Sequence, residues 1–523
     1  MRKQLTLRLK PSDAANDDLI KQIIAEAESR NISSISGFQI LKKSIDARSR
    51  QVFINLTLEA FIDEPFIYRE PISFSFPDVS RSPVRIIIIG AGPAGLFAAL
   101  KLIENGIKPI LLERGKEVRA RRRDLATLNK EGIINPESNY CFGEGGAGTY
   151  SDGKLYTRST KRGNVNHILN LLVYFGAEAN ILYEAHPHIG TNKLPGIITS
   201  IRKKIIDCGG EFWFEKKVID LLFSNGIITK VKTQDGSLIE GDAVILATGH
   251  SARDIFQLLH SKKILLEFKP FALGVRVEHP QSLIDSIQYH HSAREILLPP
   301  ASYNLVHQVG GKGVFSFCMC PGGIIAPAAT NHGEIVVNGW SPSKRNNPFA
   351  NSGMVVTVEE KDTLRFNNSG SLAGMFFQQE TEQNAFAAGG GKFVAPAQRL
   401  VDFTENIISS TLPACSYIPG ISATSMKDFL PAFIHQRLQE AFREFGKKMK
   451  GYLTNEALVV ATESRTSSPV RIPRQAETFT HPQVSNLYPC GEGAGYAGGI
   501  VSAAMDGIKV AEIIAKNQDY QPA

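Results

Sequence analysis

Three glycines that follow an apolar run are the residues whose types and spacing most clearly indicate chemistry. The run Val84–Ile89 is typical of a buried parallel strand, and a helix is expected over Leu96–Glu104. In such a turn the first glycine permits tight folding, the second lets a pyrophosphate approach the backbone, and the third lets the helix pack closely on the strand. The predicted phosphate-binding turn consists of Gly90, Gly92, Pro93, Ala94 and Gly95.

An acidic residue ends the next apolar run, about 20 residues after the glycines. Glu113 stands where a carboxylate would bind a ribose hydroxyl, and Arg114 follows it directly. An acid rather than an arginine at position 113 argues against a 2′-phosphate. A glycine-rich turn alone would also fit other α/β proteins. Here strand, glycines, helix, second strand and acid occur in order, so the sequence predicts dinucleotide binding.

Two distant segments complete a flavin pattern. An apolar strand ends in the small turn Ala247, Thr248 and Gly249, which in flavoprotein folds covers the dinucleotide. Tyr488–Gly495 combines a strand, an acid and glycines, and a helix follows whose N-terminal dipole favours negative charge on a reduced flavin. Each segment alone also fits an ordinary β-α turn, but together they favour FAD over NAD. The predicted contacts here are Gly491, Glu492, Gly499 and Ile500.

A glycine-rich loop and one strand residue extend the predicted cofactor site. Residues 143–154 contain five glycines, whose backbone N–H groups can surround a pyrophosphate, although a flexible surface loop is the alternative. The residues expected to contact FAD in this loop are Gly145, Gly146, Thr149 and Ser151, and Val218 is expected to contact the adenine. No second glycine fingerprint follows a strand, which separates the chain from reductases that carry two nucleotide-binding domains.

The elements that must position these residues divide the chain into four segments. Residues 1–78 show a β-α-β-β pattern and are predicted to form a small ferredoxin-like module. We expect the FAD domain over 84–264 and, after an inserted mixed α/β substrate domain over 265–450, again over 451–523. The predicted fold class is therefore α/β, with a glutathione-reductase-type, Rossmann-like domain.

Composition limits the classes of function. A chain of 523 residues accommodates two or three domains, and a net charge of +7 is mild, which favours anionic ligands over a nucleic-acid surface. Six cysteines do not form a secreted disulfide framework at this length, so a reducing, cytoplasmic location is expected. No apolar stretch approaches the roughly 20 residues of a membrane span. The basic run Arg119–Arg123 fits a solvated helix face and a position near phosphate equally well.

Two cysteines in a short motif allow a redox interpretation. Cys318 and Cys320 could form a strained disulfide or present a thiolate to the flavin, but buried cysteines in a strand are the stronger interpretation. No His/Cys cluster has metal-ligand spacing, so no metal site is predicted.

Several unusual strings, together with the flavin pattern, carry a family resemblance. They are Cys141–Leu155, Phe317–Gly323 and Glu463–Arg471. The chain resembles the bacterial and plastid FAD-dependent dehydrogenases without an assigned substrate, distant relatives of fumarate reductase and aspartate oxidase flavoproteins. The resemblance covers nearly the whole length. It implies an FAD domain with an inserted substrate domain, and it identifies no substrate.

Arginines are the catalytic candidates, because relatives that reduce unsaturated acids clamp carboxylates with them. The candidates are Arg276, His279, Arg465 and Arg471, and an ion pair at a domain boundary is the alternative for each arginine. His250 follows the flavin-covering turn and could contact the ring or cap a helix.

The function predicted from the sequence is oxidation or reduction of an unidentified small molecule, with an anion as one candidate, by hydride transfer through flavin N5. NAD(P)H, or another electron donor without its own Rossmann domain here, is a candidate partner. The alternatives are a flavin monooxygenase or oxidase, and an RNA-modifying or RNA-binding flavoprotein. The oligomeric state is not predicted.

Overall fold

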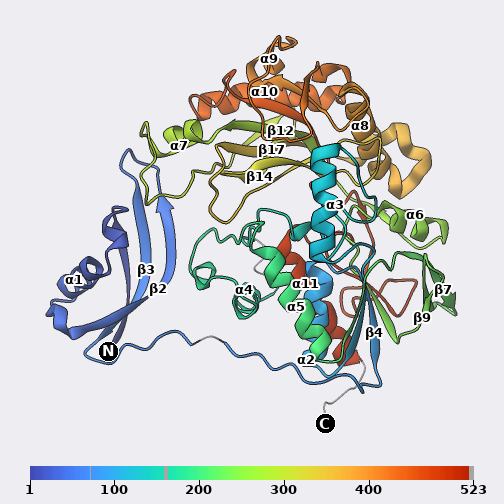
Figure 1. Cartoon of the computed structure of the whole chain (residues 1–523), viewed down its shortest axis with the longest axis horizontal. Coiled ribbons are helices and arrows are strands. Elements are labelled where there is room, and N and C mark those ends of the chain that lie inside the picture. The colour runs from blue at the N-terminus through green and yellow to red at the C-terminus, as the bar shows by residue number, and fades with distance from the viewer. Residues whose placement is uncertain (71, 158–162, 518–523) are drawn as a thin grey trace.

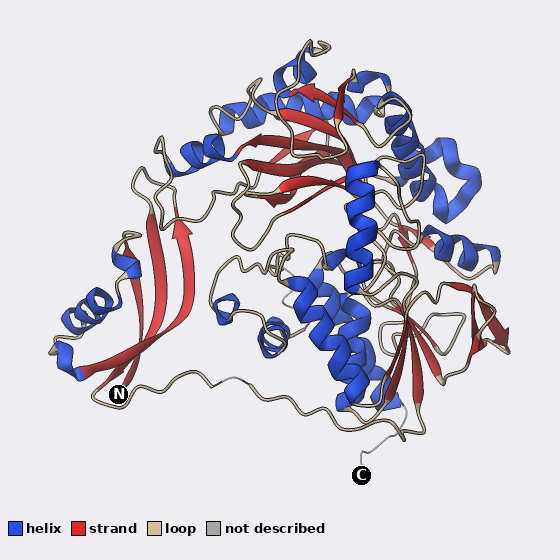
Figure 2. Cartoon of the chain, in the orientation of Figure 1, coloured by secondary structure: helices blue, strands red, loops and turns tan. Residues whose placement is uncertain are grey.

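The computed structural model describes residues 1–70, 72–157 and 163–517 and arranges them in three parts (Figure 1). A small N-terminal sheet lies at the end of a long connection and also contacts the rest of the chain directly, through backbone hydrogen bonds of Lys43 with Tyr183 and Ala185. The other two parts lie against each other, one built on a parallel sheet and one on a broad, mostly antiparallel sheet. In Figure 2 the helices of the latter part cover the sheet face that points away from the parallel-sheet part.

The N-terminal module (residues 1–62) has the predicted β-α-β-β order. Its three strands pair antiparallel in the order β1-β3-β2, and α1 packs Ile20 and Ile24 into the core. Asn16 caps α1 by accepting a hydrogen bond from the Leu19 amide. This is one split β-α-β unit plus a hairpin, half of a ferredoxin-like fold. The elements are β1 (Arg2–Leu9), α1 (Asp17–Ala27), β2 (Ile35–Asp46) and β3 (Phe53–Ile62).

The second part, called here the parallel-sheet domain, has the strand order β22-β10-β4-β5-β6, with every pair parallel. Successive isoleucines of β4 point to opposite faces, and both faces are covered, which explains the continuous apolar run in the sequence. The strands are β4 (Arg85–Ile89), β5 (Lys108–Leu112), β6 (Glu211–Trp213), β10 (Ala243–Leu246) and β22 (Leu487–Pro489).

Helices cover one face of this sheet, and a small antiparallel sheet with one helix covers the other. The first face carries α2 (Pro93–Glu104), α4 (Val165–Tyr174), α5 (Leu194–Asp207) and α11 (Ile500–Asn517). The second face carries β7 (Val218–Ser224), β8 (Ile227–Thr233), β9 (Leu238–Ile239) and α6 (Arg253–Ser261). The sequence placed residues 211–222 in one meander strand; the structure instead joins β6 to the parallel sheet and begins the meander at Val218.

The third part, the cap domain, is a seven-stranded sheet in the order β13-β14-β17-β12-β20-β18-β19. Its strands are β12 (Phe271–Pro280), β13 (Val306–Val309), β14 (Lys312–Cys320), β17 (Phe349–Val358), β18 (Ala395–Arg399), β19 (Ile421–Ala423) and β20 (Leu458–Glu463). Two short pairs accompany it, β15 (Ile324–Pro327) with β16 (Val337–Trp340) and β11 (Glu267–Phe268) with β21 (Val470–Arg471). Its helices are α7 (Gln281–Tyr289), α8 (Ala373–Ala388), α9 (Leu400–Glu405) and α10 (Ala432–Lys448).

One predicted domain boundary requires correction. The sequence returned the chain to the FAD domain at residue 451, but β20 pairs with β12 and β18 inside the cap sheet. The chain rejoins the parallel sheet only at β22. A buried apolar strand such as β20 carries no local signal for which sheet it joins, because its partners lie far away in the sequence.

The helix α3 (Val118–Glu131) stands between the two large domains (Figure 1). Its N-terminus is capped by the Glu117 carboxylate, which accepts from the Arg119 and Ala120 amides, and Gly132 ends it in a left-handed conformation. Among the described residues, no helix is long and apolar enough to cross a membrane.

The connection between the module and β4 is anchored to the parallel-sheet domain at its far end. Phe74 and Phe76 are half-buried against Tyr174 and Phe175, at ring-centroid distances from 5.4 to 6.3 Å. The buried Val79 donates its amide to the Cys208 carbonyl. The predicted module boundary at residue 78 therefore lies beyond residues that pack on the next domain.

This packing predicts different outcomes for two truncations. Deleting residues 1–64 should leave the parallel-sheet domain intact, whereas deleting residues 1–78 should cost about 2–3 kcal/mol more, since two half-buried phenylalanine rings are lost. Urea unfolding of both truncated proteins measures the difference. Equal free energies of unfolding would show that the aromatic contacts contribute nothing.

Candidate functional site

A cavity of about 400 Å³ lies where the carboxyl ends of the parallel strands meet the cap domain. This is the edge at which open α/β sheets bind ligands. Most residues predicted to bind the cofactor line it. They are Gly90, Gly92, Pro93, Ala94, Glu113, Arg114, Gly146, Ser151, Val218, Ala247, Thr248, Gly249, Glu492, Gly499 and Ile500.

The glycines of this cavity differ in what a side chain would meet. A Cβ on Gly92 would have one neighbour within 4 Å, the Gly146 Cα at 4.0 Å, and a Cβ on Gly249 or Gly499 would meet nothing. A Cβ on Gly95 would lie 2.0 Å from the Gly90 carbonyl oxygen. Gly95 is thus required for helix–strand packing, whereas Gly92 borders open space at the N-terminus of α2. An elongated anionic group fits that space, because the helix dipole and unpaired amides face it.

Glu113 joins the first glycine turn to the second glycine-rich loop. Its buried carboxylate accepts hydrogen bonds from the amides of Ala91 (3.0 Å), Gly115 (2.9 Å) and Gly143 (3.0 Å). Arg114 beside it pairs with Asp254 through two hydrogen bonds of 3.0 and 2.8 Å. Glu113 therefore holds the turn in shape in addition to lining the cavity.

Four predicted contacts lie behind the cavity wall and support it. Gly95 packs against the Gly90 carbonyl, and Gly145 donates its amide to the Ala91 carbonyl at 2.9 Å. The Thr149 hydroxyl donates to the Glu144 carbonyl at 2.6 Å, and the Gly491 amide donates to Asp506 at 2.7 Å. None of the four lines the cavity, and their direct contact with FAD stays a prediction.

Arg121, from the basic run on α3, is the supporting residue that the sequence did not identify. Its fully buried guanidinium donates to the carbonyls of Asn139, Tyr140, Glu144 and Gly146 at 2.8 to 3.0 Å. The run is thus neither a solvated face at this position nor a phosphate contact. Its spacing held no signal for this role, since the carbonyls belong to a loop about 20 residues away.

The opposite wall of the cavity comes from the cap domain, and of its residues the sequence singled out only Cys318 and Arg465. Its residues include Phe317 and Cys318 of β14, Asn338 of β16, Glu463 of β20 and Thr466. Lys154, at the end of the glycine-rich loop, lies between the two walls. No local motif indicates Asn338 or Glu463, because Glu463 is placed by the cap sheet and Asn338 by the separate pair of β15 with β16.

The catalytic candidates Arg276 and Arg465 are engaged by carboxylates. Arg276 is fully buried behind the wall, with its Nε 2.7 Å from Glu463 and one NH group 2.6 Å from Asn351. Arg465 lines the cavity, but it donates to Glu382 at 3.2 and 3.0 Å and to Glu334 at 3.0 Å. Both arginines therefore form ion pairs, which were expected from the sequence as the alternative to binding a substrate.

His279 and Arg471 lie away from the cavity, which corrects their assignment as substrate contacts. The His279 ring is buried in the cap core, where its Nε2 lies 2.8 Å from the Tyr452 carbonyl. Arg471 is exposed on β21 and reaches Glu267 at 3.8 Å. His279 is close to Arg276 in the sequence and Arg471 is close to Arg465, but neither His279 nor Arg471 lines the cavity.

Two titratable side chains, His250 and Glu492, lie together where the turn Ala247–Gly249 contacts the segment Tyr488–Gly495. Burial raises the pKa of Glu492 to about 7 and lowers the pKa of His250 to about 4, so the imidazole is neutral at physiological pH. The two side chains approach to 3.6 Å, and His250 Nδ1 has no hydrogen-bond partner among the described residues. Helix α6 begins at Arg253 with Ala252 as its N-cap, so His250 is not a helix cap.

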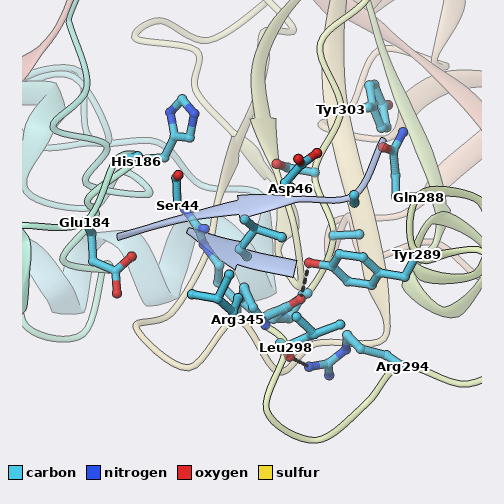
Figure 3. Close-up of a pocket in the computed structure, with 18 of the residues that line it drawn as sticks. Ser44, Asp46, Glu184, His186, Gln288, Tyr289, Arg294, Leu298, Tyr303 and Arg345 are labelled. Atoms are coloured by element: carbon cyan, nitrogen blue, oxygen red, sulfur yellow. Dashed lines mark hydrogen bonds between the residues drawn. The ribbon is translucent and has the colours of Figure 1, made fainter. Parts of the chain in front are cut away.

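A second, larger cleft of about 1550 Å³ opens between the N-terminal module and the two large domains (Figure 3). Among the described residues, seven lysines and arginines line it against two carboxylates, Asp46 and Glu184. Arg345 at its wall pairs at 3.0 Å with Asp152, which lines the first cavity. One ion pair therefore separates the charged cleft from the predicted cofactor cavity.

Comparison with known proteins identifies the family. Residues 84–263 match the model for "Pyridine nucleotide-disulphide oxidoreductase", and residues 270–466 match "FAD-dependent protein, C-terminal domain-like". A protein described as uncharacterized from Clostridium beijerinckii is 39% identical over 524 residues, covering 96% of this chain and 97% of that protein. The chain belongs to a family of FAD-dependent oxidoreductases. Its cofactor is FAD, held in a mixed α/β fold with a Rossmann-like domain. Residues 1–61 match a domain of unknown function.

Several solved structures show a distant likeness in fold. A tetracycline destructase, Tet(51), is 13% identical with a TM-score of 0.34, over 83% of this chain and 81% of that one. A geranylgeranyl bacteriochlorophyll reductase-like protein from Thermoplasma acidophilum has 13% identity and a TM-score of 0.36, over 84% and 81%. The 2,6-dihydroxypyridine-3-hydroxylase from Arthrobacter nicotinovorans has 12% identity and a TM-score of 0.37, over 84% and 85%.

The open space at Gly92 generates a first prediction for the site. Gly92→Val should abolish FAD retention while leaving the flavin-free protein within about 1 kcal/mol of wild type, since its side chain enters the cavity and meets no protein atom closely. Flavin absorbance of the purified protein and urea unfolding measure the two effects. Gly95→Ala, whose Cβ collides with backbone, should instead destabilise the protein itself. Full FAD occupancy in Gly92→Val would place the pyrophosphate elsewhere.

The Arg121 network generates a second. Arg121→Met should destabilise the protein by about 3 kcal/mol or more and reduce FAD retention, because four buried carbonyls lose their donor. Arg122→Met, on the exposed side of the same helix, is the matched control and should change stability by about 0.5 kcal/mol or less. Equal stability of the two variants, measured by chemical unfolding, would remove Arg121 from this role.

Proposed function

We propose that the protein is an FAD-dependent dehydrogenase or reductase that acts on a small molecule between the parallel-sheet domain and the cap domain. The cavity with one wall from each domain carries this proposal. When bound, FAD supplies hydride transfer through its N5 atom. The glycine turns, Glu113 and the α2 N-terminus bind the cofactor, while Lys154, Asn338 and the remaining cap residues orient the small molecule and exclude water.

The clamp expected by analogy with fumarate reductases is not supported by the three arginines. Two of them already pair with carboxylates, and the third lies outside the cavity. An anionic reactant instead finds positive charge in the large cleft, where seven basic residues face two acids. We therefore propose that an anionic electron donor such as NAD(P)H, or an anionic substrate, approaches the flavin through this cleft.

Anaerobic reduction of the bound flavin tests the proposal. NADH or NADPH should bleach the oxidised-flavin absorbance, and Lys344→Glu with Lys450→Glu, both at exposed cleft positions, should raise the concentration for half-maximal rate several-fold. Lys509→Glu, exposed on α11 outside both cavities, carries the same charge change per site and should behave as wild type.

Two outcomes would contradict the proposal. Identical rates in the cleft variants and the control would remove the cleft as the route. Rapid reoxidation by O₂ with incorporation of oxygen into a product would favour a monooxygenase over a dehydrogenase.

A further inference from the structure

Cys318 and Cys320 lie together in the wall of the FAD cavity. Both belong to the end of β14; the Cys320 thiol donates to the Cys318 carbonyl at 3.2 Å, and each sulfur lies 3.8 Å from Lys154 Nζ. Cys318 lines the cavity and is half-buried, whereas Cys320 is buried directly behind it. The more accessible sulfur thus has a second sulfur within reach.

The backbone at this pair departs from a regular strand. The register between β14 and β17 shifts between Phe317 and Cys320, and Cys318 has a φ of 47°. A non-glycine residue in the left-handed region is strained, and such strain is concentrated at functional positions. The bulge turns Cys318 toward the cavity instead of leaving it in the sheet.

Two cations face the sulfurs from different elements. Lys154 Nζ lies 3.8 Å from each Sγ atom and also donates to the Met319 carbonyl. The Arg276 guanidinium, from β12, donates to the Cys318 carbonyl at 3.3 Å. The carboxyl groups around the pair are Asp152, Glu463 and Glu492.

These contacts shift the pKa values of the two thiols in opposite directions. The neighbouring Cys320 side chain, with the charges of Lys154 and Arg276, holds the pKa of Cys318 well below its ordinary range despite burial. The Cys318 side chain and burial raise the pKa of Cys320. An accessible thiolate backed by a protonated thiol is the arrangement of an attacking and a resolving cysteine.

We propose that Cys318 and Cys320 form a redox-active dithiol that reduces small disulfides entering the FAD cavity. The Cys318 thiolate attacks a disulfide RSSR, forming a protein–SR mixed disulfide and releasing RS⁻. The Cys320 thiol then attacks Cys318 Sγ, forming the 318–320 disulfide, and its proton leaves with the second sulfur as RSH. Two electrons pass from the protein dithiol to the substrate, and charge balances, since one thiolate is consumed and one released.

Mass spectrometry of the full-length FAD-loaded protein tests the exchange with oxidised glutathione as the probe. Wild type should lose two hydrogens, located in the peptide containing Cys318 and Cys320. Cys320→Ser should instead gain one glutathionyl group on Cys318, because the mixed disulfide is not resolved, and Cys318→Ser should do neither. Cys208→Ser, at a buried cysteine outside the cavity, is the control and should match wild type.

The pH dependence of alkylation gives a second readout. Iodoacetamide should modify Cys318 with a midpoint well below the ordinary thiol pKa of about 8.5. Lys154→Met should slow the modification at pH 6.5 by about tenfold or more, the change for one pKa unit. Retained flavin absorbance reports that this variant folds.

Either of two results overturns the proposal. One is the absence of a Cys318 adduct in Cys320→Ser, and the other is a Cys318 midpoint near 8.5. Neither depends on hydride transfer, so a redox-inactive pair would leave the proposed dehydrogenase reaction intact. Conversely, a bound flavin that neither NADH nor NADPH reduces would leave the thiol chemistry unchanged.

Discussion

One buried cation, Arg121, sets the shape on which the FAD site depends. Removing a guanidinium from water costs several kcal/mol, and here four backbone carbonyls of one loop compensate for that cost. Those hydrogen bonds curl residues 139–146 around the arginine and press the loop against the first glycine turn, where Gly145 donates to Ala91. Glu113 completes the closure from the other side. The two glycine-rich segments form one wall because the Glu113 carboxylate binds an amide of each, and the Arg121 guanidinium holds the second segment in place.

Charge also holds the cap domain over the site. Arg253 and Arg465 share Glu382 and Glu334 in a buried cluster that joins α6 to the cap. Arg276 is committed to Glu463 within the cap sheet. Residues that would clamp a carboxylate if they were free are instead part of the framework. Lys154, whose Nζ lies 3.8 Å from the sulfurs of Cys318 and Cys320, belongs to the glycine-rich loop and not to the arginine motifs.

The sequence predicted what is encoded locally. Each of the predicted cofactor segments occupies a few consecutive residues, whose conformation follows from their own residue types. They are the first glycine turn, Glu113, the turn Ala247–Gly249 and the segment Tyr488–Gly495, and residues from each line the cavity. Asn338 was missed because nothing in the local pair of β15 with β16 indicates a cavity wall. Glu463 was missed because β20 pairs with β12 and β18, which lie far away in the sequence. The assignment of β20 failed for the same reason. His279 shows the converse error, in which proximity to Arg276 in sequence was taken for proximity in space, although alternate strand residues point to opposite faces.

The ion pair of Asp152 with Arg345 joins the wall of the FAD cavity to the wall of the large cleft. Asp152 is almost fully buried, and Lys154 and Arg345 together outweigh burial and keep its pKa below the ordinary value. A permanently charged carboxylate at this position competes with the thiolate of Cys318 for Lys154. The cleft and the FAD cavity therefore share one ion pair, and its carboxylate also lies 3.9 Å from the Lys154 ammonium group that contacts both sulfurs.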